Sequence, residues 1–220
     1  MTTAQGPREP TPVTWTLSGA ADSAQRSGIR VGVLALQGDF LEHTLMLTHV
    51  GAQASEVRQP RDLEGLQALI LPGGESTTVA RLMDLYGLRE PLIRRVRDGL
   101  PVWGTCAGLI LLARRLVEGR PTPLGLVDIQ VSRNFYGRQM DSFETDLPVP
   151  ALGDEPFHAI FIRAPAIVDS GPGVEVLARL PDGTPVAARQ GHVLVTSFHP
   201  ELTRDTRFHS YFLSLVDTKH

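Results

Sequence analysis

Short apolar runs alternate with amphipathic segments through the first half of this 220-residue chain, and this alternation constrains the fold more than any other feature. The first run, Arg-Val-Gly-Val-Leu-Ala-Leu at 30–36, is nearly continuous in apolar side chains, as expected of a parallel strand buried on both faces. Further strands are predicted at 54–58 and 68–71, and helices at 40–50, 77–86 and 89–98. Such alternation predicts an α/β fold with a doubly wound, mostly parallel central sheet and helices on both faces.

The second half of the chain has a different rhythm, in which strands follow one another through turns. After about residue 124, strands are predicted at 126–131, 159–162, 174–180, 185–188 and 193–198, before a last helix at 205–216. Pro181-Asp182-Gly183 and Gln190-Gly191 are turn signals between them. We therefore expect extra antiparallel strands in the C-terminal half.

Composition sets the domain organisation and excludes several classes of function. Residues 1–28 are rich in Thr, Pro, Ser, Ala and Gly without periodicity and predict a flexible extension, which leaves 29–220 as a single domain. A net charge of −3 gives no basic excess for nucleic acid or an anionic membrane. One cysteine excludes an intrachain disulfide and a cysteine-based zinc cluster. Without a signal-peptide core or a membrane-span-length apolar segment, we expect a cytoplasmic protein.

The single cysteine lies between two glycines in Gly104-Thr105-Cys106-Ala107-Gly108, the spacing of a nucleophile elbow. An apolar strand at 100–103 precedes it, and a helix is predicted over 109–115. A thiol at the positive end of a helix dipole is favoured as the nucleophilic thiolate. The alternative is a buried cysteine acting as a small hydrophobe, and the pattern alone also fits hydrolases, peptidase-like proteins and amidotransferases.

A histidine and a glutamate follow the last predicted strand in His199-Pro200-Glu201. Ligands collect beyond the carboxyl ends of strands in open α/β sheets, so His199 is expected on the same sheet edge as Cys106. It would accept the thiol proton and protonate a leaving amine, while Glu201 would fix its tautomer. The alternative is a strand-end histidine satisfied by a neighbouring carboxylate.

Two glycines, Gly73-Gly74, follow the predicted strand at 68–71. Successive glycines let backbone N–H groups approach an oxyanion closely, and the N–H of Gly74 with that of Ala107 would make a two-donor oxyanion hole. The structural interpretation is a glycine turn with Ser76 or Thr77 capping the next helix, and both interpretations can hold together.

From about Ile29 to Val216 this combination resembles the class I (triad) glutamine amidotransferases, and within them the glutaminase subunits of pyridoxal 5′-phosphate synthase. The superfamily is indicated by Gly-x-Cys-x-Gly with a later His-Pro-Glu. The narrower group is indicated by Leu34-Ala35-Leu36-Gln37-Gly38, Pro72-Gly73-Gly74-Glu75-Ser76-Thr77-Thr78, Arg133-Asn134 to Gly137-Arg138-Gln139, Asp141-Ser142-Phe143-Glu144, and Phe161-Ile162-Arg163-Ala164-Pro165.

The resemblance implies a Cys106–His199–Glu201 triad that hydrolyses L-glutamine through a glutamyl thioester, without a metal or cofactor. It implies that the substrate is held by Gly74, Glu75, Ser76, Arg133, Ile162 and Arg163. Ammonia would pass to a (β/α)8-barrel synthase partner that makes pyridoxal 5′-phosphate, so the chain would have no site of its own for that step. Ordinary ion pairs are the alternative role for Arg133 and Arg163.

The same resemblance implies weak activity until the synthase docks, with an oxyanion donor completed on binding by rearrangement at Gly73 and Gly74. Part of the docking face is expected around Gln37, Gly38 and His43. Two rival functions stay open: a triad glutaminase for another synthase, and a non-catalytic regulatory subunit with the same fold.

Overall fold

The computed structural model describes residues 28–133, 135 and 142–216, and a seven-stranded sheet runs through its centre in the order β10-β11-β12-β4-β3-β1-β2. The strands are β1 (Arg30–Leu34), β2 (Gln53–Val57), β3 (Ala68–Leu71), β4 (Val102–Thr105), β10 (Glu175–Arg179), β11 (Pro185–Gln190) and β12 (Val193–Thr196). Pairing is parallel from β12 through β4, β3 and β1 to β2, and antiparallel in β10-β11-β12. The α/β fold with extra antiparallel strands is therefore confirmed.

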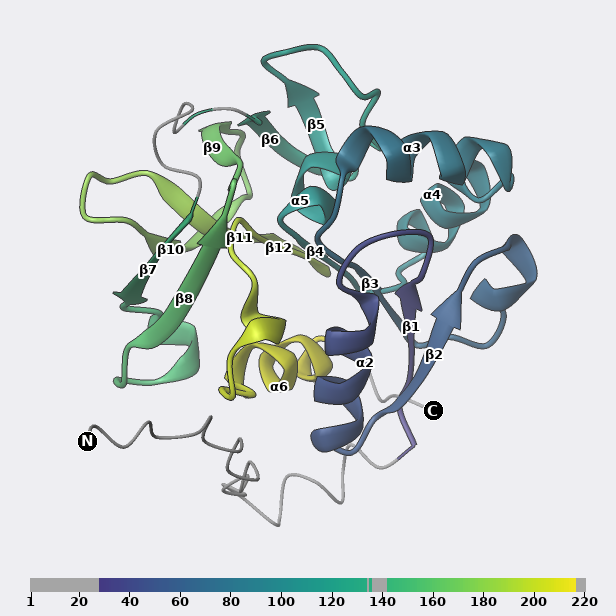
Figure 1. The fold of residues 1–220 in the computed structure, drawn as a ribbon, viewed down its shortest axis with the longest axis horizontal. Helices are drawn as coiled ribbons and strands as arrows, with labels where there is room; N and C mark the ends of the chain where they lie inside the picture. The colour runs from purple at the N-terminus through teal and green to yellow at the C-terminus, as the bar shows by residue number, and fades with distance from the viewer. Residues whose placement is uncertain (1–27, 134, 136–141, 217–220) are drawn as a thin grey trace, which may run out of the picture.

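Helices cover both faces of this sheet (Figure 1). On one face lie α3 (Ser76–Leu85), α4 (Arg89–Arg97) and α5 (Ala107–Leu112), and on the other lie α2 (Phe40–His49) and α6 (Arg207–Ser214). Alternate side chains of each buried strand enter the two cores: Leu69 and Leu71 pack with the α3–α5 layer, and Ile70 packs with α2 and α6. This two-sided burial explains why the parallel strands are apolar throughout.

Two small sheets extend the domain beside β10–β12. One contains β5 (Ala113–Leu116), β6 (Val127–Ser132) and β9 (Ala166–Ser170), and the other pairs β7 (Ser142–Leu147) with β8 (Phe157–Ile162). Short 3-10 turns cover Pro60–Leu63, Pro150–Leu152 and Pro200–Leu202. Among the described residues, no helix is long and apolar enough to cross a membrane.

The helix predicted over 109–115 is wrong at its C-terminal end. The helix α5 stops at Leu112, and Ala113 takes an extended backbone (φ −54°, ψ 155°) that begins β5. Parallel pairing of β5 with β6 overrides the local helical preference of this segment. The strands β7 and β9 were not predicted. Of the predicted extension, residues 1–27 lie outside the described part of the chain, as do Asn134, 137–139 and Asp141.

Candidate active site

Cys106 occupies a sharp turn between β4 and α5. Its backbone has φ 47° and ψ −100°, a combination that non-glycine residues rarely adopt, and its exposed fraction is 7%. The flanking glycines make this turn possible: a Cβ on Gly104 would lie 2.5 Å from the Gly108 carbonyl group, and one on Gly108 would lie 1.9 Å from the Leu71 carbonyl oxygen. The predicted elbow is therefore present, and close backbone packing requires both glycines.

The predicted His199–Glu201 pair lies just beyond the end of β12. Nδ1 of His199 donates to Glu201 Oε1 at 2.7 Å, and both residues are almost fully buried. Burial lowers the pKa of His199. Close contact with Cys106 and Glu201, and the charges of these two groups, outweigh burial and raise the pKa to about 10. Burial also raises the pKa of Glu201, and the contact with His199 opposes that rise. His199 is therefore held as an imidazolium beside the sulfur.

The sulfur of Cys106 has a second neighbour in the carbonyl group of Ile162. The Sγ–O distance is 3.8 Å, and Cys106 is the donor in this arrangement. Within the described part of the chain, Nε2 of His199 has no aligned hydrogen-bond acceptor. The sulfur and the imidazole are thus neighbours, but the thiol is not directed at the imidazole nitrogen.

The predicted glycine loop lies against the imidazole. Gly74 has φ 148°, and a Cβ on Gly73 would lie 2.4 Å from His199 Cε1. The Gly73 carbonyl oxygen accepts from the Asp39 N–H at 3.2 Å, and the Glu75 N–H donates to Gln37 Oε1 at 2.7 Å. The loop after β1 therefore fixes the orientation of the glycine loop.

These segments surround a cavity of about 420 Å³. Its lining includes eight residues predicted for the site: Gly74, Glu75, Ser76, Cys106, Arg133, Ile162, Arg163 and His199. Asp39 and Ile110 also line it and were not predicted. Asp39 follows an apolar strand as the predicted residues do, and its Oδ2 lies 3.4 Å from His199 Nδ1.

Glu75 and Arg133, both predicted to hold substrate, contact each other across the cavity. Arg133 Nη2 lies 3.3 Å from Glu75 Oε1. The Glu75 carboxylate also caps α3 by accepting from the N–H groups of Thr77 and Thr78, so the alternative of a Ser76 or Thr77 cap is wrong. Burial is the largest single influence on the Glu75 carboxyl group and raises its pKa, but the hydrogen bonds from Thr77 and Thr78 together outweigh burial and lower the pKa. Glu75 is thus a firmly ionised carboxylate beside a guanidinium.

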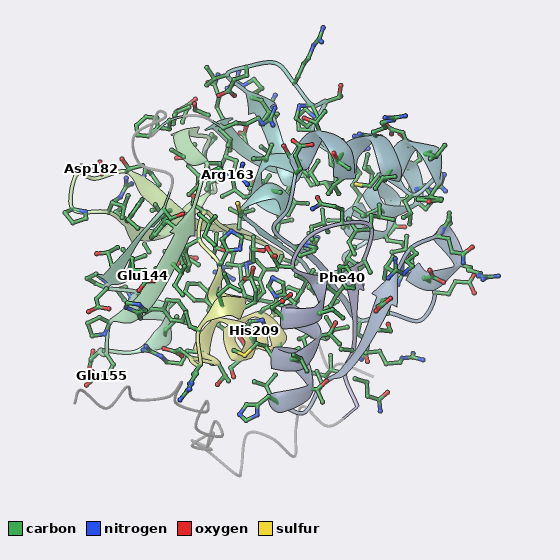
Figure 2. All side chains as sticks on the ribbon, viewed as in Figure 1. Phe40, Glu144, Glu155, Arg163, Asp182 and His209 are labelled. Carbon is green, nitrogen blue, oxygen red and sulfur yellow. The ribbon has the colours of Figure 1, made fainter. Side chains whose placement is uncertain are left out.

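Arg163 follows β8 with a positive φ of 42°. It lies at the end of that strand, on the side toward the middle of the molecule (Figure 2). The strained backbone places the Ile162 carbonyl group beside the sulfur and the Arg163 side chain at the cavity.

His43 does not lie on a docking face. Its exposed fraction is 0%, and its side chain reaches from α2 to Thr105 on β4, whereas Gln37 and Gly38 are partly exposed and line the cavity. The expectation that His43 contacts a partner is therefore wrong.

Asp39, His199 and Glu201 carry ligand-type atoms within 4.8 Å of one another. The histidine and the glutamate use those atoms in their mutual hydrogen bond, and the third group is a single carboxylate. This arrangement is better suited to stabilising an imidazolium than to holding a metal ion.

Comparison with known proteins identifies the family. The model of the SNO glutamine amidotransferase family matches residues 33–218. The chain belongs to this family. Relatives named pyridoxal 5′-phosphate synthase subunit PdxT, from Roseiflexus sp. (strain RS-1) and from Herpetosiphon aurantiacus, are each 56% identical and cover 84% of this chain and 99% of their own length.

A solved structure agrees with the assignment to the SNO family, and a more distant one shares the fold. A crystal structure of a glutamine amidotransferase has a TM-score of 0.80 at 53% identity and covers 84% of this chain and 98% of its own. The structure of PurLQS from Thermotoga maritima has a TM-score of 0.64 at 17% identity, which is a likeness of fold alone.

Proposed function

We propose that this chain is the glutaminase subunit of a pyridoxal 5′-phosphate synthase. It hydrolyses L-glutamine to L-glutamate and ammonia and delivers the ammonia to a synthase subunit. Membership of the SNO family and the names of its 56%-identical relatives support this function. The observation that carries the proposal is the meeting of Cys106 and His199 at one cavity, next to Glu201.

In the proposed reaction, the Cys106 thiolate attacks the side-chain amide carbon of glutamine. The N–H groups of Gly74 and Ala107 stabilise the oxyanion of the tetrahedral intermediate. His199 gives its Nε2 proton to the departing ammonia, which leaves a γ-glutamyl thioester on Cys106. His199 then accepts a proton from the water that attacks the thioester, and Glu201 holds the imidazole throughout.

The charged groups of the cavity match the two charges of a free amino acid. The Arg133 and Arg163 guanidinium groups suit the α-carboxylate, and the ionised Glu75 suits the α-ammonium group. The Arg133–Glu75 contact would then be exchanged for contacts to substrate. Ser76 and the Ile162 backbone would complete the set.

The resting geometry supports dependence on a partner. The thiol contacts the Ile162 carbonyl oxygen, and the Asp39 N–H holds the Gly73 carbonyl group. Docking of a (β/α)8-barrel synthase near Gln37 and Gly38 would rearrange the glycine loop and complete the oxyanion hole. The expected setting is a heteromeric complex in the cytoplasm, because a reducing compartment keeps the Cys106 thiol free.

The test combines the protein with a pyridoxal phosphate synthase subunit, glutamine, a pentose phosphate and a triose phosphate, and follows the product chromophore. Glutamine-dependent product should disappear in Cys106→Ala and persist when an ammonium salt replaces glutamine. Absence of glutamine-dependent product with a competent synthase would contradict the proposal. Equal glutamine hydrolysis with and without the synthase would contradict the partner dependence alone.

A further inference from the structure

Two buried histidines that the proposed mechanism does not use lie next to the triad. His43 on α2 and His209 on α6 both have an exposed fraction of 0%. His43 Nδ1 lies 3.1 Å from His209 Nε2, and His209 is on the side of α6 that faces α2 (Figure 2). Two imidazoles removed from water need fixed hydrogen-bond partners, so this contact defines where their protons lie.

The other nitrogen of His43 reaches the triad. His43 Nε2 lies 3.1 Å from Thr105 Oγ1 and 3.3 Å from Glu201 Oε2. Thr105 directly precedes Cys106 in the sequence. The other carboxylate oxygen of Glu201, Oε1, accepts the hydrogen bond from His199 Nδ1. One ring therefore contacts both the nucleophile elbow and the carboxylate that orients the imidazole.

The surroundings determine which nitrogen of His43 carries the proton. Burial, followed by the charges of His209 and His199, lowers the pKa of His43 well below its ordinary value, and burial lowers the pKa of His209 to about 3. Both rings are therefore neutral, with one N–H each. Oε2 of Glu201 has no aligned donor among the described residues and lies 3.3 Å from His43 Nε2, so a proton on Nε2, which attracts the carboxylate, is favoured.

This placement determines the proton of the second ring as well. With Nε2 protonated, His43 Nδ1 must accept, and His209 therefore donates from Nε2. The remaining atom, His209 Nδ1, is buried and has no partner within the described residues. It is then a bare acceptor, and an unpaired acceptor is tolerated better than an unpaired buried N–H.

We propose that His43 is a positioning residue for glutamine hydrolysis, with its tautomer fixed by His209. Its Nε2 proton is donated to Thr105 Oγ1 and lies beside Glu201 Oε2, and this electrostatic contact keeps the carboxylate turned toward His199. The chain of contacts from Cys106 through His199 to Glu201 thus continues through the imidazoles of His43 and His209 to α6. The activity readout rests on the proposed glutaminase function, and the proton placement is tested without it.

The activity test compares His43→Leu with His43→Gln, in complex with the synthase subunit. Leucine keeps the packing volume against Trp103 but removes the N–H, and we expect kcat to fall about tenfold with KM little changed. His199, Asp39 and His43 lie close to Glu201, and we expect loss of the polar Nε2–H beside Oε2 to raise the pKa of Glu201 further. The acid limb of the kcat–pH profile should therefore move to higher pH.

The side chain of a glutamine at position 43 can place an amide N–H near the position of the histidine Nε2. His43→Gln should therefore recover most of the rate and restore the acid limb of the kcat–pH profile to its wild-type position. His49→Leu, in the last turn of the same helix, is the matched control and should leave both unchanged. A folded His43→Leu variant with wild-type kcat and an unshifted profile would overturn the proposal.

The second test uses ¹⁵N-histidine NMR of the free full-length chain. His43 and His209 should each give the signals of a neutral ring protonated at Nε2, without titration between pH 6 and 8. In His209→Leu, the His43 signals should shift toward a mixture of tautomers. A proton on Nδ1 of His43 in the wild-type chain would refute the proposal even if the glutaminase function holds.

Discussion

His199 carries a raised pKa, and this determines how glutamine hydrolysis should depend on pH. The pKa of about 10 lies above the ordinary 6.5, so the imidazolium persists through neutral pH and is lost as the pH rises toward 10. Glu201→Gln removes a charge that raises this pKa, so the alkaline limb of kcat/KM should move to lower pH. A pH profile of the synthase-bound enzyme measures it, and an unmoved limb would mean that Glu201 does not act on His199 electrostatically.

Gly73 lies so close to the His199 imidazole that there is no room for a Cβ atom at this position. An alanine Cβ at this site would lie 2.4 Å from His199 Cε1 and 2.7 Å from Asp39 Oδ2, so Gly73→Ala should displace the imidazole. Because misplacing a reacting group by about 1 Å costs about a hundredfold in rate, we expect a loss of that order. Steady-state glutamine hydrolysis by the complex is the measurement.

The control for this substitution is Gly87→Ala, at an open site with φ +65°. Backbone strain there should reduce the free energy of unfolding by about 1–2 kcal/mol and leave the rate unchanged. If Gly73→Ala showed the same behaviour, the contact with His199 would have no catalytic consequence.

At the scale of elements, the sequence predicts those whose pattern is local. The strand at 68–71 agrees with β3 residue for residue, α2 and α4 end one residue earlier than predicted, and α3 begins and ends one residue earlier than predicted. The failures lie where tertiary contacts decide. Residues 113–116 have helical propensity but form a strand because they pair with β6. The strand β7 has mostly polar side chains because one of its faces is exposed, so its sequence lacks the apolar run by which the other strands are predicted.

Close packing of α5 on the sheet gives a prediction at this scale. A Cβ on Gly108 would lie 1.9 Å from the Leu71 carbonyl oxygen, and backbone cannot turn aside as a side chain can. Gly108→Ala should therefore push α5 from β3, lower the free energy of unfolding by about 1–3 kcal/mol, and slow hydrolysis by moving Cys106. Urea denaturation together with the glutaminase assay tests both effects.

Gly183→Ala is the comparison variant, since its site in the β10–β11 turn is open and has φ +88°. Strain should destabilise it by about 1–2 kcal/mol without slowing hydrolysis. A Gly108→Ala variant as stable and active as the wild type would show that α5 can shift without cost.

For the whole molecule, the candidate site is assembled from segments far apart in the chain that meet at the carboxyl ends of parallel strands. Sequence reasoning could find Cys106, Gly74 and His199 because each follows an apolar run. It could not find the contact between His43 and Glu201. That contact depends on how α2 packs against the sheet, and a histidine within a helical pattern carries no signal of it.

The functional unit of this chain is expected to begin near residue 28. Gln37 is the first of the described residues that line the cavity, and the match to the SNO family begins at residue 33. A chain reduced to residues 28–220 should therefore hydrolyse glutamine, in complex with the synthase, within about twofold of the full-length rate. Affinity for the synthase should be measured alongside, by titrating it against a fixed amount of each chain. A truncated chain that hydrolyses glutamine normally at saturating synthase but needs far more of it would instead assign residues 1–27 a role in docking.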